Sequence, residues 1–112
     1  MDELSVKSEI RRNAAVVTIS GRVDSVSAAA LDEQLSKIAH ENNRLALDLS
    51  DVTYLSSAGV RAIVKTLQSA EKSGGGVVLA NVSDAVRRVL ETVGMMQMLR
   101  VFPSVEEAVG SF

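Results

Sequence analysis

The sequence predicts an α/β domain with a mixed, mainly parallel central β-sheet. Short runs of β-branched and aliphatic residues alternate along the chain with longer stretches in which apolar residues recur about every 3.6 positions. Alternating strands and helices favour right-handed crossovers and parallel pairing, and a hairpin at the start of the chain adds an antiparallel edge strand. We therefore expect 4–5 strands and about four α-helices.

The size and charge of the chain favour a single folded domain. Its 112 residues are enough for one domain, residues 1–112, with a core that needs no covalent cross-links. Apolar residues make up 46% of the chain and charged residues 23%, as in ordinary folded proteins. The 12 basic and 14 acidic residues are mixed along the sequence, so we expect no surface for nucleic acid or for anionic membranes.

The lack of cysteine and the single histidine restrict the chemistry. They exclude disulfides, thiolate metal sites and His-rich metal clusters. No set of nucleophile, base and orienting group can be assembled, so we expect a binding protein without a metal or cofactor rather than an enzyme. The sequence shows no signal-peptide pattern and no apolar run of about 20 residues, which leads us to expect a cytoplasmic protein without membrane insertion.

The N-terminal third predicts a hairpin followed by a helix. Residues 3–8 alternate weakly and residues 14–20 form a β-branched run, with a turn at residues 11–13 between them. The pattern becomes helical from Asp24, and either Asp24 or Ser25 is a suitable N-cap. The apolar stripe of this helix consists of Val26, Leu31, Leu35 and Ile38.

The middle of the chain predicts two strands on either side of a long helix. Residues 44–49 are short and apolar enough to be a central strand, and the helix runs from about Ser57 to about Ser73. Three glycines at 74–76 end this helix, and residues 77–80 form the next strand.

The C-terminal third predicts a helix, a short strand and a last helix. Ser83 caps the first of these helices, and Gly94 lies where a C-cap glycine belongs. A short strand at 100–102 and a helix near 104–109 complete the chain. A cluster of flexible apolar side chains precedes them, which we expect to form core beneath the last helix, although such side chains also serve adaptable binding surfaces. This cluster consists of Met95, Met96, Met98 and Leu99.

The loops that follow the parallel strands indicate where a site would lie. Such loops converge on one edge of a parallel sheet, where ligands and partners usually bind. Here they are residues 21–24, 50–57 and 81–83. If the strands are neighbours, helix N-termini gather there with polar side chains from Asp24, Ser56, Ser57 and Ser83.

The run Ser56-Ser57-Ala58-Gly59 has almost no side-chain bulk. A serine before a helix caps free backbone N–H groups, and one serine is enough for that role. The rest of the run leaves backbone and hydroxyl groups open to approach by another protein.

Three segments of the sequence resemble the STAS domain proteins, and specifically the bacterial anti-sigma factor antagonists. They are DLSDVTYLSSAGVRAI at 48–63, GRVD at 21–24 and NVSDAVRRVLETVGM at 81–95. The resemblance covers nearly the whole chain, and it implies a STAS-like single domain.

The resemblance also implies a function and a site. In such antagonists, a serine at the start of the second helix is phosphorylated by the anti-sigma factor, a serine kinase of the GHKL type, and a serine phosphatase reverses the modification. Unphosphorylated antagonist binds the anti-sigma factor and phosphorylated antagonist releases it, so transcription is regulated by partner switching.

Aligning the family's Gly-hydrophobic pair with Gly59-Val60 places the acceptor at Ser57. The family usually has Asp just before the acceptor, where this chain has Ser56, which makes Ser56 a second candidate acceptor. The expected partner surface consists of Asp24, Ser56, Ser57, Ala58, Gly59, Val60, Arg61 and Ser83.

Two alternatives belong to other classes of protein. Stand-alone STAS domains also resemble structural subunits of membrane lipid-transport ABC complexes, in which the domain is not phosphorylated. Asp48 and Asp51 suggest the phosphoacceptor of a response-regulator receiver, but such a domain needs an acidic pair after its first strand to hold Mg²⁺. The first predicted strand leads instead into Arg11-Arg12-Asn13.

Overall fold

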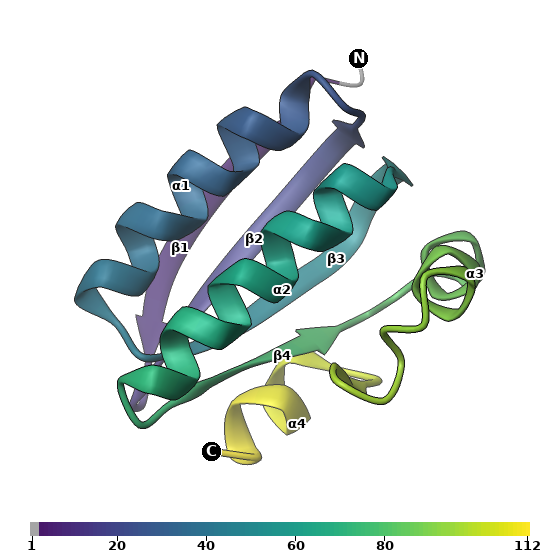
Figure 1. Ribbon diagram of the computed structural model, residues 1–112. Coiled ribbons are helices and arrows are strands. Elements are labelled where there is room, and N and C mark those ends of the chain that lie inside the picture. The colour runs from purple at the N-terminus through teal and green to yellow at the C-terminus, as the bar shows by residue number, and fades with distance from the viewer. Residues whose placement is uncertain (1–2) are drawn as a thin grey trace.

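The strands lie across the sheet in chain order in the computed structural model, which describes residues 3–112 (Figure 1). The strands are β1 (Ser5–Arg11), β2 (Ala14–Val23), β3 (Arg44–Leu55), β4 (Gly76–Ala80) and β5 (Arg100–Phe102). The helices are α1 (Ser27–Glu41), α2 (Ser57–Lys72), α3 (Asp84–Thr92) and α4 (Val105–Gly110). The pair β1–β2 is antiparallel and the other pairs are parallel, which confirms the predicted fold class.

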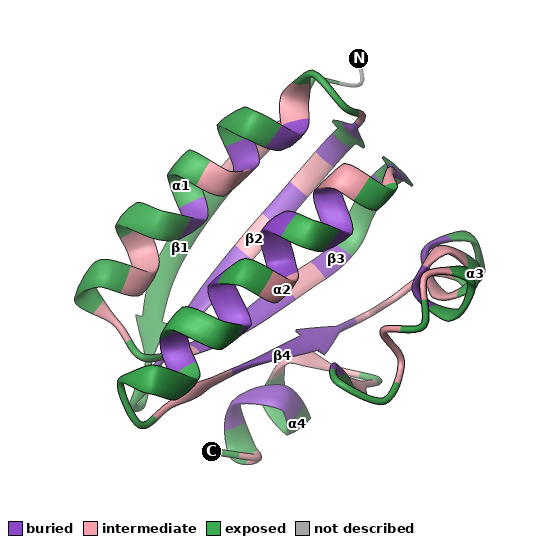
Figure 2. Cartoon of the chain, in the orientation of Figure 1, coloured by how far each residue is buried: buried purple, intermediate pink, exposed green. Residues whose placement is uncertain are grey.

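Helices cover both faces of the sheet. Alternate residues along the central strands point to opposite sides, so Val17 and Leu47 join a core with α1, α2 and α3, while Val16 and Ala46 join a cluster with α4. Figures 1 and 2 show α1 and α2 lying side by side over one face of the sheet. Burial on both faces explains why these strands read as continuous apolar runs in the sequence.

Both β2 and β3 are longer than the sequence pattern predicts. The expected loop at 50–57 is strand as far as Leu55, and the expected turn at 21–24 is strand as far as Val23. Pairing with β2 shifts in register twice, and each shift adds one residue to β3. These irregularities break the period of two that identifies a strand, which is why residues 50–55 resemble a loop in the sequence.

The methionine cluster packs on the face opposite to the predicted one. Leu99 is buried in the core shared with α2 and α3, where Met95 and Met96 pack against it, whereas α4 belongs to the cluster on the other face. Met98 is exposed. The prediction that these residues lie beneath the last helix was therefore wrong.

Candidate functional site

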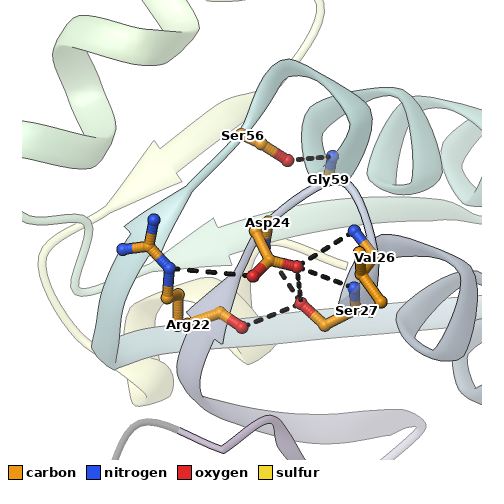
Figure 3. A network of polar contacts seen from close by, with 6 residues as sticks. All are labelled: Arg22, Asp24, Val26, Ser27, Ser56 and Gly59. Atoms are coloured by element: carbon orange, nitrogen blue, oxygen red, sulfur yellow. Dashed lines mark hydrogen bonds and ion pairs between the residues drawn. The ribbon is translucent and has the colours of Figure 1, made fainter.

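Ser56 connects the end of β3 to the start of α2. Its backbone N–H donates to the Val23 carbonyl oxygen at 2.8 Å. Its Oγ accepts from the Gly59 N–H at 3.2 Å, as Figure 3 shows. Ser56 is therefore the N-cap of α2, as one of the two serines was predicted to be. The same residue fixes the helix start beside the end of β2.

Ser57 is the first residue of α2 and is exposed to solvent. Its hydroxyl forms no hydrogen bond with any of residues 3–112, because Ser56 already caps the helix. No hydrogen bond of the fold depends on the Ser57 hydroxyl, so this group is free to react or to bind a partner.

Gly59 is buried rather than part of the surface. A Cβ at this position would lie 2.7 Å from Leu55 Cδ1 and 2.7 Å from Val23 Cγ1. The absence of a side chain therefore allows α2 to pack closely on the ends of β2 and β3. Val60 is only 2% exposed, whereas Ala58 is half-buried and Arg61 is exposed. The expectation that Gly59 forms open surface for a partner is thus corrected by its packing.

Asp24 and Ser27 form a reciprocal cap at the start of α1. Asp24 Oδ1 accepts from the backbone N–H groups of Ser27 at 2.8 Å and Val26 at 3.0 Å, while Ser27 Oγ accepts from the Asp24 N–H at 2.9 Å (Figure 3). The predicted cap role thus falls to Asp24 and not to Ser25. The Asp24 carboxylate also accepts a hydrogen bond from the Ser27 hydroxyl at 3.0 Å. The Asp-x-x-Ser spacing was the signal that could have identified Ser27.

These contacts lower the pKa of the Asp24 carboxyl below its ordinary value of 3.8. The main causes are the hydrogen bonds from the Ser27 N–H and hydroxyl, supported by the Val26 N–H and the nearby Arg22 guanidinium, while partial desolvation opposes them.

The Asp24 carboxyl is expected to titrate below pH 3.8 when followed by NMR, because its contacts favour the charged form. Since this pKa is lowered by folding, the associated stability is fully present above pH 3.8 and is lost as the pH falls through the folded-state pKa. Asp24→Asn should be less stable than the native chain at pH 6, and the difference should shrink at low pH. A Ser27→Ala variant is the control, because losing the hydroxyl should raise the pKa of Asp24. A midpoint at or above 3.8 in the native chain would contradict this account.

Arg22 and Tyr54 form a second contact at the same edge. Arg22 Nε lies 3.7 Å from Asp24 Oδ2, and its guanidinium carbon lies 4.2 Å from the centre of the Tyr54 ring. Arg22 and Tyr54 are partners in the β2–β3 register. The sequence pattern missed this pair because residues 50–57 were expected to be a loop.

Ser83 lies apart from the other predicted site residues. Its Oγ accepts from the Val86 N–H at 3.2 Å and caps α3 as predicted. However, β4 ends at Ala80, which pairs with Asp48, and β3 continues from there to Leu55. At about 3.3 Å per residue, roughly 20 Å of strand separates the end of β4 from the end of β3. The expected gathering therefore includes Asp24, Ser56 and Ser57 but not Ser83.

Two grooves border the N-terminal half of α2, one on each side. The first, of about 550 Å³, lies between α2 and the end of α3 with the segment after it; it is lined by Ser57, Val60, Arg61, Val64, Lys65, Gln68, Val93 and Met95. The second, of about 260 Å³, lies toward α1 and is lined by Ser25, Ala28, Ala29, Asp32, Ala58, Arg61, Ala62 and Lys65. Because Arg61 and Lys65 line both grooves, α2 forms a basic ridge between them, with Ser57 at its N-terminal end.

Within residues 3–112, no three acidic or histidine side chains are grouped so that they could hold a metal ion. None of the helices formed by these residues has both the length and the apolar character needed to cross a membrane.

Comparisons with known proteins agree on one family. The family model described as STAS domain matches residues 5–108. An anti-sigma-B factor antagonist of Bacillus subtilis is 30% identical over 98 residues, which cover 88% of this chain and 90% of the relative. The anti-sigma-F factor antagonist RsfB of Mycobacterium tuberculosis is 30% identical over 110 residues, covering 96% and 88%. The crystal structure of an anti-sigma factor antagonist from Mycobacterium paratuberculosis aligns with a TM-score of 0.88 at 25% identity and covers 98% of this chain and 94% of that one.

Proposed function

Because this chain belongs to the STAS domain family, we propose that it is an anti-sigma factor antagonist that is switched by phosphorylation of Ser57. With Ser57 unmodified, the chain binds an anti-sigma factor and so regulates transcription. Phosphorylation of Ser57 releases that partner, and a serine phosphatase restores the binding form. The exchange takes place in the cytoplasm, where ATP and the transcription machinery are found.

The exposed hydroxyl of Ser57 is the observation that carries this proposal. Ser56 already caps α2 through its Oγ, so a phosphate on Ser57 removes no hydrogen bond from the fold. At the first residue of a helix, the phosphate also meets the positive end of the helix dipole. The folded chain can therefore carry the modification without rearrangement.

Ser57 acts in this scheme as the substrate of a partner kinase of the GHKL type. The Ser57 oxygen bonds to the γ-phosphorus of ATP, the bond from that phosphorus to the bridging oxygen of ADP breaks, and the hydroxyl proton passes to a base on the kinase. All catalytic groups belong to the kinase, so this chain itself is a binding protein and not an enzyme.

Incubation of the chain with its cognate anti-sigma factor and ATP, followed by peptide mass spectrometry, tests the acceptor. We expect one phosphate on Ser57 in the native chain and in Ser56→Ala, and none in Ser57→Ala. Ser56→Ala removes a helix cap that contributes about 1 kcal/mol to stability. Circular dichroism of each variant therefore checks that it folds. Phosphate on Ser56 alone would overturn the assignment to Ser57. Purification with an ABC ATPase, and no phosphate on either serine, would instead favour the structural subunit of a lipid-transport complex.

A further inference from the structure

Ser57 and Arg61 lie on the same side of α2, one helical turn apart. Residues at positions i and i+4 have Cβ atoms about 5–6 Å apart, and both of these side chains line the same 550 Å³ groove. The order is also favourable, because an acidic group N-terminal to a basic one at this spacing is the more stabilising arrangement in a helix.

Arg61 is available for a new partner, unlike Lys65 and Arg22. Lys65 Nζ, on the next turn, lies 3.0 Å from Asp32 Oδ2, and Arg22 contacts both Asp24 and Tyr54. Arg61 is exposed and forms neither an ion pair nor a cation–π contact within the part of the chain that the structure describes.

We propose that Arg61 is the counter-ion of the phosphate on Ser57 and that this pairing withdraws the Arg61 guanidinium from the rim of the groove. This inference rests on the proposed function, because it takes Ser57 as the acceptor. A guanidinium binds a phosphate through two parallel hydrogen bonds, which an ammonium group cannot reproduce. The floor of the groove is largely apolar, with Val64, Val93 and Met95 contributing to it. Phosphorylation would thus have two effects on a docked partner, by adding negative charge at one end of the groove and by engaging the unpaired cation beside it.

The phosphate of a chain carrying phosphoserine at position 57 provides a direct test. Phosphoserine is installed during translation, so the result does not depend on a kinase. Titration followed by ³¹P NMR measures the second pKa of the phosphate, which is about 6 in an unperturbed phosphoserine. Removing a nearby positive charge destabilises the dianion, so Arg61→Gln should raise this pKa by about half a unit. The effect of the helix N-terminus is common to both proteins and cancels.

Matched variants separate this contact from a general effect of charge. Lys65→Gln removes the same charge one turn further along the helix and should leave the phosphate titration close to that of the native chain. Arg61→Lys should restore only part of the shift, and 1 M NaCl should reduce the difference between the native chain and Arg61→Gln. The phosphate should also move the Arg61 Nε–H resonance.

Equal titration of the native chain and Arg61→Gln, or an equal shift in Lys65→Gln, would overturn the role of Arg61. Neither outcome would change the assignment of Ser57 as the kinase substrate, because the mass-spectrometric experiment tests that assignment independently.

Discussion

Gly75→Ala is expected to destabilise the folded chain by about 3 kcal/mol or more, because a Cβ at this position would overlap the backbone carbonyl group of Asn43. Backbone atoms cannot move aside as the end of a flexible side chain can. The Asn43 carbonyl oxygen also accepts the Gly76 N–H at 2.8 Å, so displacing it disturbs the entry into β4. Urea denaturation followed by circular dichroism measures the effect.

Gly76→Ala is the matched control. Its Cβ would make only an ordinary contact, 3.8 Å from Phe112 Cε1, although the position is adjacent in the sequence. Both substitutions reduce the entropy of the unfolded chain to a similar extent, so the difference between them reports the overlap at Gly75. The predicted overlap would be contradicted if the free energies of unfolding of Gly75→Ala and Gly76→Ala differed by less than about 1 kcal/mol, which is the size of the unfolded-state effect alone.

Phosphoserine at position 57 is expected to weaken binding of the anti-sigma factor by roughly 30-fold to more than 1,000-fold. A partner docked on the ridge of α2 would have to desolvate the phosphate and would lose its own contact with the Arg61 guanidinium. Losing one member of a buried, hydrogen-bonded charge pair typically costs an interface about 2–5 kcal/mol. At about 1.4 kcal/mol per factor of ten, this cost corresponds to the stated range. Isothermal titration calorimetry with the native and phosphoserine proteins measures the change.

Phosphoserine at position 69 controls for added charge. Ser69 is an exposed residue near the C-terminal end of the same helix and lines neither of the two grooves. Because the modified group would lie about 18 Å from Ser57 along the helix axis, binding should change little. A similar loss of affinity with phosphate at either position would show that net charge, rather than the position of Ser57, governs release.

Most of the helices and strands could be predicted from local sequence signals. The residues that begin and end these elements act on backbone groups only three or four positions away. Ser56, Ser83 and Asp24 cap helices as their side-chain chemistry predicts. The features that were missed depend on pairing between distant segments. The length of β3 follows from two register shifts against β2. The burial of Gly59 follows from its contact with Val23, which belongs to a distant part of the sequence.

In the candidate site, too, some features follow from local signals and others from the pairing of distant segments. The sequence pattern identified the serine run, but capping could belong to either serine until the Ser56 hydrogen bond to Gly59 was seen. The sequence pattern groups Ser83 with the site because parallel strands usually end at one edge of the sheet. Here β3 continues well beyond the end of β4, and only strand pairing reveals the offset.

The hydrogen bond from Ser56 to Val23 also bears on how a kinase can recognise its target. It anchors the start of α2 to β2, and the contact of Gly59 with Val23 and Leu55 holds the first turn against the sheet. An enzyme that reads an extended peptide would have to unwind this turn and separate α2 from the sheet. A kinase acting on Ser57 would therefore recognise the shape of the native domain, and a short peptide with the same residues would lack most of what it recognises.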